Sequence, residues 1–383
     1  MNLAERYLVL GLRLGRHVDG LVDAYYGPSE LKKQIDAEEL VPTEQLAADG
    51  QALLAEVPDG WLRDQVVGCA TYARVLAGEE LAYADEVEAC YGVRPVRTPL
   101  SVYEAAHAEL DELLPGDGSL FERRQAWRTR HLVDGDLVPR ALEDVLPLLR
   151  ERTEAFVSLP DGEQLAVEPV RDEPWWAFNY YLGDLRSRVA VNVDIPTTAV
   201  DVIHLAAHEV YPGHHTEHAV KEQLLLRERG ALEEAIQLVP TPQAVLSEGV
   251  AELGLEVVLD ADGRAAAYDI LARHGIEVDR ERVDAIAKAL EPLETVGLDA
   301  ALNVYEDGAS AEDAQRYIEE WRLATPEQAQ HSVRFFMDPT WRAYGITYSA
   351  GKALCRAYVG DDPARFRRLL TEHVRIGELH GAL

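Results

Sequence analysis

Cysteine and long hydrophobic runs are scarce in this sequence of 383 residues, and each scarcity excludes a class of protein. Cys69, Cys90 and Cys355 are scattered and form no CxxC pair, which argues against a disulfide framework or a cysteine metal site. No run of 18 apolar residues occurs, and the charged N-terminus lacks the apolar segment of a signal peptide. We therefore expect a soluble, cytoplasmic protein.

Positive charge is also scarce. The chain has 37 Lys and Arg against 68 Asp and Glu, which gives a formal net charge of −31. Nucleic-acid binding requires a basic surface, and anionic lipid surfaces likewise attract basic segments. We therefore expect neither a nucleic-acid nor a membrane partner, while the oligomeric state stays open. The hydrophobic content of 47% is ordinary for a folded globular protein.

The first half of the chain has the apolar periodicity of helices, interrupted by proline and glycine. The predicted helical segments are 3–22, 43–56, 61–90, 100–114, 119–131 and 138–157.

Residues 160–196 have a different pattern, with short alternating stretches that favour a small antiparallel sheet. Its predicted strands are 164–170, 175–182 and 189–193. Helices resume after Pro196, with Thr197 or Thr198 as the N-cap. We predict a mainly α fold with one small antiparallel sheet, a helical region over 1–159, and a sheet plus catalytic helices over 160–383. The two regions are expected to form one continuous fold.

Histidines cluster directly after the predicted sheet, in the sequence HLAAHEVYPGHHTEH. Five of the twelve histidines of the chain lie in this window, namely His204, His208, His214, His215 and His218. Chance is a poor explanation for such a cluster, and imidazole suits zinc and other late first-row metals. We interpret His204 and His218 as packing or supporting residues, and expect the metal ligands among the other three.

His208 and Glu209 begin like the zinc-protease motif HExxH, in which two histidines one helical turn apart hold the metal. The position of the second histidine is occupied by Pro212, so the strict motif fails.

A break in the helix would bring a second histidine close enough to His208 for both to bind one metal ion. In a continuous helix, a residue six positions after His208 is rotated by roughly 240° and displaced by about 9 Å. Proline removes a backbone hydrogen bond and glycine tolerates unusual torsions, so a break at Pro212-Gly213 would bring His214 beside His208. His215 is the alternative, on nearly the same face but about 10.5 Å along a straight helix.

HEVYPGHH resembles the HE-x-Y-P-G-H-H signature of the DUF885 family, which is related to M32-type carboxypeptidases and other helical gluzincins. Residues 245–252 resemble the E-G-W-A segment of that family, with Val250 in place of tryptophan. Asp338-Pro339 and the later Tyr348-Ser-Ala-Gly-Lys352 resemble its Y-x-x-G segment. The resemblance covers about 190–383, in the right order.

The resemblance implies a helical gluzincin-like fold and one divalent metal ion, most simply Zn²⁺. It implies His208, His214 and Glu248 as ligands. Glu248 also heads an acidic stripe with Glu252 and Glu256, predicted to lie on one helix over 242–259. Glu252 is then expected to orient a histidine from outside the ligand set. The alternative for the stripe is a solvated helix face.

The implied mechanism is hydrolysis by metal-activated water, with Glu209 as general base. Tyr348 is the first candidate to stabilise the oxyanion, and Tyr344 is the second candidate and a substrate-binding residue.

A peptide substrate with a free C-terminus would need a cation for its carboxylate. Lys352, Arg356 and Arg342 are the candidates, although each could instead neutralise acidic surface. The strand at 189–193 is expected to align the substrate backbone at a sheet edge, and Asn179 to Tyr181 are further candidates for this contact.

Three functions are therefore open. The leading one is a metal-dependent, zinc hydrolase of peptide or related amide bonds, with carboxypeptidase activity as one form. The second is a metal enzyme with other chemistry on a small molecule. The third is a non-catalytic binding protein whose metal holds helices together.

Overall fold

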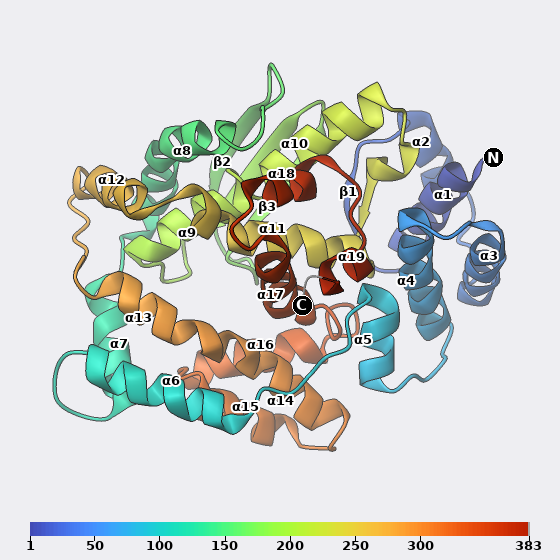
Figure 1. Cartoon of the computed structure of the whole chain (residues 1–383). Coiled ribbons are helices and arrows are strands. Elements are labelled where there is room, and N and C mark those ends of the chain that lie inside the picture. Colours follow the sequence, from blue (N-terminus) through green and yellow to red (C-terminus); the bar gives the residue numbers. More distant parts are fainter. Residues whose placement is uncertain (382–383) are drawn as a thin grey trace.

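The computed structural model describes residues 1–381 and is mainly helical, as predicted (Figure 1). The helices before the larger sheet are α1 (Leu3–Gly15), α2 (Ser29–Ala37), α3 (Thr43–Glu56), α4 (Trp61–Leu76), α5 (Tyr83–Tyr91), α6 (Leu100–Leu113), α7 (Leu120–Arg130) and α8 (Val138–Glu154). Those after it are α9 (Ala199–Glu209), α10 (His214–Lys221), α11 (Pro242–Val258), α12 (Ala261–Ala272), α13 (Val283–Leu290), α14 (Val296–Tyr305), α15 (Ala311–Trp321), α16 (Pro326–Met337), α17 (Ile346–Val359), α18 (Pro363–Thr371) and α19 (Ile376–His380). None of the helices within residues 1–381 has the length and apolar character needed to cross a membrane.

Two predicted helices differ from the structure. The helix predicted over 3–22 ends at Gly15, and Val22–Tyr25 forms strand β1 instead. The chain turns at Gly20, whose φ of +77° favours glycine. The helix predicted over 61–90 is two helices, α4 and α5, separated by a short connection.

The larger sheet has the strand order β2-β4-β3, formed by β2 (Gln164–Val170), β3 (Ala177–Gly183) and β4 (Arg186–Asn192). β3 and β4 are antiparallel, as predicted, whereas β2 pairs parallel with β4, so this sheet is mixed. β4 lies between the other two, so the prediction of a free edge at 189–193 is wrong. β3, which contains Asn179 to Tyr181, lies at an edge instead.

A second, two-stranded antiparallel sheet joins β1 to β5 (Ile236–Leu238). It pairs Val22 with Leu238, residues that are far apart in the sequence, and local periodicity gave no sign of it.

α11 lies at the centre of the molecule, next to α17 and α9 (Figure 1). Helices α6, α7 and α13–α16 form a layer along one side, and α1–α4 gather at one end. One hydrophobic core extends from Tyr83 to Leu379 and so crosses the predicted boundary at 159. A second core lies between α1, α3, α4 and β5. The division into regions 1–159 and 160–383 stays a prediction.

Candidate metal centre

The histidine segment is two helices joined by a break. α9 begins at its N-cap Thr198, whose side chain accepts a hydrogen bond from the Asp201 backbone, and it ends at Glu209. α10 begins at His214. Between them the backbone of Gly213 packs against His208, with no room for a side chain. The helix is therefore broken at Pro212-Gly213, as the sequence predicts. Both His208 and His214 face α11.

Three side chains converge at this break. The Nε2 atoms of His208 and His214 are 3.2 Å apart. Glu248 Oε2, from α11, lies 3.4 Å from His208 Nε2 and 3.8 Å from His214 Nε2. His215 points elsewhere, with Nε2 2.9 Å from Glu163 Oε2. The structure thus brings His214, rather than His215, to His208 and Glu248.

The donor set fits a zinc ion. Zinc bonds of about 2.0–2.1 Å place tetrahedral ligand atoms about 3.3 Å apart, close to the three separations found here. Glu248 Oε2 is buried and has no hydrogen-bond partner among the described residues, which suits a ligand atom. Two imidazoles and one carboxylate form a group whose ligand atoms lie within 4.8 Å of one another. Three protein ligands leave a fourth position for water or substrate, as in catalytic rather than structural zinc sites.

The second and third sequence motifs meet beside this group. α11 and α17 approach so closely that a Cβ on Gly249 would lie 2.4 Å from the carbonyl oxygen of Gly351. This approach places Tyr348 of the last motif, and Tyr344 just before α17, beside the candidate ligands. Tyr344 Oη donates a hydrogen bond of 2.6 Å to Glu248 Oε1. Tyr348 packs edge-on against the Tyr344 ring and is 39% exposed.

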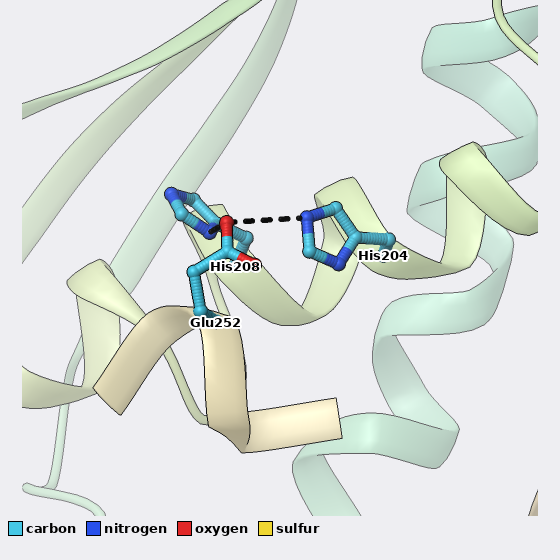
Figure 2. Close-up of side chains that lie close together, drawn as sticks. All are labelled: His204, His208 and Glu252. Atoms are coloured by element: carbon cyan, nitrogen blue, oxygen red, sulfur yellow. Dashed lines mark ion pairs between the residues drawn. The ribbon is translucent and has the colours of Figure 1, made fainter. Parts of the chain in front are cut away.

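Glu252 lies between two histidines of α9 (Figure 2). Its Oε1 is 3.3 Å from His208 Nδ1 and 3.6 Å from His204 Nε2. A carboxylate on the far nitrogen of a ligating histidine fixes its tautomer and ring orientation. Glu252 and His204 therefore lie where the sequence predicts supporting residues, but these two and His208 also form a second group whose atoms could hold a metal ion, so the supporting role stays a prediction.

His214 is supported by a buried polar chain that sequence reasoning missed. His214 Nδ1 lies 3.2 Å from Ser247 Oγ, which donates a 2.6 Å hydrogen bond to Glu217 Oε2. The other oxygen of Glu217 accepts 2.7 Å hydrogen bonds from Lys221 and Gln243. The only local signal was the i, i+4 spacing of Glu217 and Lys221.

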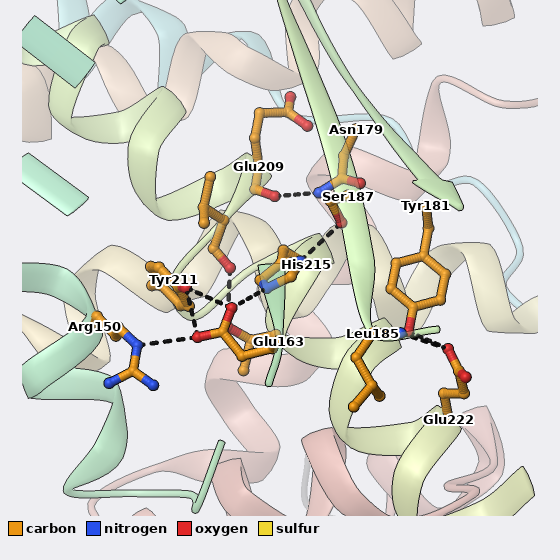
Figure 3. A network of polar contacts seen from close by, with 12 residues as sticks. Arg150, Glu163, Asn179, Tyr181, Leu185, Ser187, Glu209, Tyr211, His215 and Glu222 are labelled. Carbon is orange, nitrogen blue, oxygen red and sulfur yellow. Dashed lines mark hydrogen bonds and ion pairs between the residues drawn. The ribbon is translucent and has the colours of Figure 1, made fainter. Parts of the chain in front are cut away.

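A second network fastens the break to the sheet (Figure 3). Glu163 accepts hydrogen bonds from Tyr211 and Arg150 and contacts His215, whose Nδ1 lies 2.8 Å from Ser187 Oγ. These side chains hold the chain on both sides of the Pro212-Gly213 turn. Both ring nitrogens of His215 have protein partners, so this histidine is satisfied without a metal ion.

Asn179 of β3 donates a 2.5 Å hydrogen bond from Nδ2 to the backbone carbonyl of Glu209. Figure 3 shows the Glu209 carboxylate turned away from this contact. The backbone at Glu209 is therefore anchored to the sheet while its side chain is left for another role.

Electrostatic effects at the centre are large. Burial disfavours a charged His208 ring, but the Glu248 and Glu252 carboxylates outweigh it and raise the pKa of His208 well above its usual range. Burial acts to raise the pKa of Glu248, but His208 and His214 outweigh it and hold this pKa below its ordinary value. Burial of His218 outweighs the nearby charge of Glu217 and lowers the pKa of His218 to about 4.

Asp23 lies in β1, at the irregularity between Val22 and Ala24 in the β1–β5 pairing. Bulges of this kind re-aim side chains next to functional sites. Burial, with the charges of Glu248 and Glu209, raises the pKa of Asp23 to about 6. The Asp23 side chain nevertheless keeps contact with solvent. No local sequence pattern singles out Asp23.

The predicted substrate-binding cations have acidic partners. Arg342 pairs with the buried Glu86. Lys352 Nζ lies 3.4 Å from both Glu256 and Glu291, and Arg356 pairs with the same two carboxylates. Their role in substrate binding stays a prediction.

Comparisons with known proteins show the fold alone. A solved structure described as the putative lipoprotein from Colwellia psychrerythraea is similar, with a TM-score of 0.54 and 15% sequence identity. The match covers 92% of this chain and 68% of that one. No family model matches the sequence, and no curated protein matches it.

Proposed function

We propose that this protein is a zinc-dependent hydrolase of peptide or related amide bonds, with His208, His214 and Glu248 as the ligands. The observation that carries the proposal is the spacing of the three ligand atoms, 3.2, 3.4 and 3.8 Å apart, around a position with three protein ligands. A structural zinc site would need a fourth protein ligand. The resemblance of HEVYPGHH to the DUF885 signature supports the same chemistry.

When bound, Zn²⁺ supplies an activated water and polarises the carbonyl of the scissile amide. Glu209 follows a ligand directly and ends α9, so its carboxylate is available to take a proton from water and pass it to the leaving amine. Asn179 holds the Glu209 backbone and limits its movement.

Tyr348 is the donor for the developing oxyanion. Its hydroxyl has no hydrogen-bond partner among residues 1–381, and its ring packs beside Tyr344, which is bonded to a ligand. An unpaired donor next to the metal position is suited to stabilise charge that appears only in the transition state.

The test is metal analysis combined with turnover of a library of short peptides. We expect one zinc per chain, peptide cleavage, and loss of cleavage in Glu209→Gln with zinc retained. Glu151→Gln, which changes an exposed glutamate of α8, is the matched control and should leave turnover unchanged.

The other outcomes of this test contradict the proposed hydrolase or favour one of the alternative functions. A protein that binds no metal overturns the proposal. Stoichiometric iron with a coloured spectrum would favour small-molecule chemistry, and zinc without turnover of any amide would favour a binding protein.

A further inference from the structure

The second ring nitrogen of His208 is directed away from the candidate zinc centre. Nε2 lies with His214 and Glu248, whereas Nδ1, on the other side of the ring, lies 3.3 Å from Glu252 Oε1. His208 is only 8% exposed, and Nδ1 is buried with no hydrogen-bond partner within residues 1–381. The contact with Glu252 is therefore close without the geometry of a hydrogen bond. Because buried polar atoms are normally paired, a bound ion is one explanation for this nitrogen.

His204 approaches the same carboxylate from the other side (Figure 2). Its Nε2 lies 3.6 Å from Glu252 Oε1, which is too long for a hydrogen bond. Tetrahedral zinc ligands are about 3.3 Å apart, so the oxygen is near a ligand's distance from both rings. The three ligand atoms all lie within 4.8 Å of one another. Two imidazoles and one carboxylate are also the donor set of the first centre.

The spacing of His204 and His208 is that of the two histidines in HExxH. They lie four residues apart on α9, which is unbroken between them, and their ring centroids are 5.5 Å apart. Side chains at this spacing share a helix face, which is how HExxH presents both histidines to one metal ion. The break at Pro212-Gly213 removes such a pair after His208, but the pair before it is intact.

Glu252 has no basic side chain to offset its charge. Within the described residues 1–381, its ion-pair contacts are the two histidines alone, and its side chain is 15% exposed. An enclosed carboxylate is costly unless a positive charge or hydrogen bonds compensate it. The His204 side chain is 29% exposed, so one member of the group stays open to solvent, as an entry path for an ion requires.

We propose that His204 Nε2, His208 Nδ1 and Glu252 Oε1 form a second site for a divalent first-row metal ion such as Zn²⁺. The His208 ring bridges the two sites: its Nδ1 proton leaves to solvent, and each ring nitrogen then binds one ion. Because the second ion must displace this proton, it binds after the first. Purified protein then holds one zinc, and excess zinc fills both sites. The proposal rests on the ligands assigned under the proposed function but does not require amide cleavage.

The first test titrates metal-free protein with zinc in competition with a chelator. We expect two zinc ions per chain, the second bound more weakly. His204→Gln should lose the second ion and keep the affinity for the first, because His204 gives no atom to the first centre. His331→Gln, at an exposed histidine of α16, is the matched control and should keep both. Wild-type protein that stops at one zinc, or a second zinc that His204→Gln retains, would overturn the second site.

The second test detects the shared ring by electron paramagnetic resonance with two equivalents of Cu²⁺. Two copper ions joined through one imidazole ring are magnetically coupled, so the signal of isolated Cu²⁺ should be reduced in the wild type and in His331→Gln. In His204→Gln the one bound ion should give its full signal. Two bound copper ions with an uncoupled spectrum would show that they do not share His208, and would overturn the proposal.

Glu248→Gln separates the second site from the first. This change removes a ligand of the first centre and leaves the three atoms of the second in place. We expect the variant to bind one zinc weakly and the double variant Glu248→Gln, His204→Gln to bind none. Equal zinc binding by these two proteins would contradict the second site.

Failure of the hydrolase proposal has a different signature. Wild-type protein that binds two zinc ions but cleaves no amide would refute the hydrolase and leave the second site standing. Protein that cleaves amides and holds a single zinc in excess metal would refute the second site alone.

Discussion

Gly213 packs so tightly against His208 that a Cβ at position 213 would lie 1.8 Å from the His208 carbonyl oxygen. This contact closes the turn between α9 and α10 and sets the place of His214. Pro212 packs in turn against Gly254 of α11, where a Cβ would lie 2.7 Å from the proline ring. The ligand spacing therefore depends on a backbone approach as well as on the histidines.

We expect Gly213→Ala to weaken zinc binding at least tenfold and to destabilise the fold by about 2 kcal/mol or more, because the methyl group must push the two helices apart. Chelator competition and thermal unfolding measure the two effects. Gly297→Ala is the control, since a Cβ there meets nothing within 4 Å. That helical position should be neutral or gain about 0.5–1 kcal/mol. Unchanged zinc affinity in Gly213→Ala would show that the turn does not set the ligand spacing.

Glu252→Gln should reduce zinc affinity about 10- to 100-fold, because the amide no longer holds the His208 ring as a charged acceptor. Glu256→Gln, one turn further along α11 and more exposed, is the matched control and should retain full affinity. Competition with a coloured chelator gives both values. If the two variants bind zinc equally, Glu252 has no orienting role.

We expect substitutions of Tyr348 and Tyr344 to affect different quantities, kcat for the first and zinc affinity for the second. Tyr348→Phe is expected to lower kcat about 10²- to 10³-fold with zinc affinity unchanged, as for the loss of one oxyanion donor. Tyr344→Phe removes the hydrogen bond to Glu248 and should weaken zinc binding instead. Steady-state kinetics and zinc titration of both variants make the comparison. The reverse pattern would exchange their roles.

Glu217 and Lys221 form a fully buried ion pair, with both side chains about 1% exposed. Lys221→Met should destabilise the protein by about 3–5 kcal/mol, because Glu217 is then left charged and buried without its partner. The double variant Glu217→Gln, Lys221→Met should regain most of this loss. Urea unfolding at neutral pH measures all three proteins, and a double variant no more stable than Lys221→Met would contradict the pairing.

The same pair predicts a dependence of stability on pH. Burial acts to raise the pKa of Glu217, but the charge of Lys221 and the hydrogen bonds outweigh it and lower the pKa from 4.5 to about 2. A depressed folded-state pKa stabilises the protein above the unfolded value and loses that effect as the pH falls from about 4.5 towards 2. This contribution is on the order of 3 kcal/mol. The urea midpoint of the wild type should therefore fall more steeply than that of the double variant below pH 4.5. Parallel pH dependences of the urea midpoint in the two proteins would refute the predicted contribution of Glu217.

The local sequence was enough for the parts of the site that depend on neighbours in the chain. Thr198 caps α9, the helix over 242–259 ends one residue early at Val258, and the chain breaks at Pro212-Gly213. Each follows from backbone chemistry within a few residues. The predicted helix over 3–22 is too long because Val22–Tyr25 pair with β5 instead, and a contact across more than 200 residues has no local signature.

The sequence by itself determined that histidine and glutamate, rather than cysteine, supply any metal ligands here, and that the chain is helical with a small sheet. Only the tertiary structure decided that His214 faces Glu248 while His215 is held by Glu163. The physical reason is that a side chain's direction after a helix break depends on what packs against it. Here the packing partners are α11, β4 and α17, from distant parts of the chain.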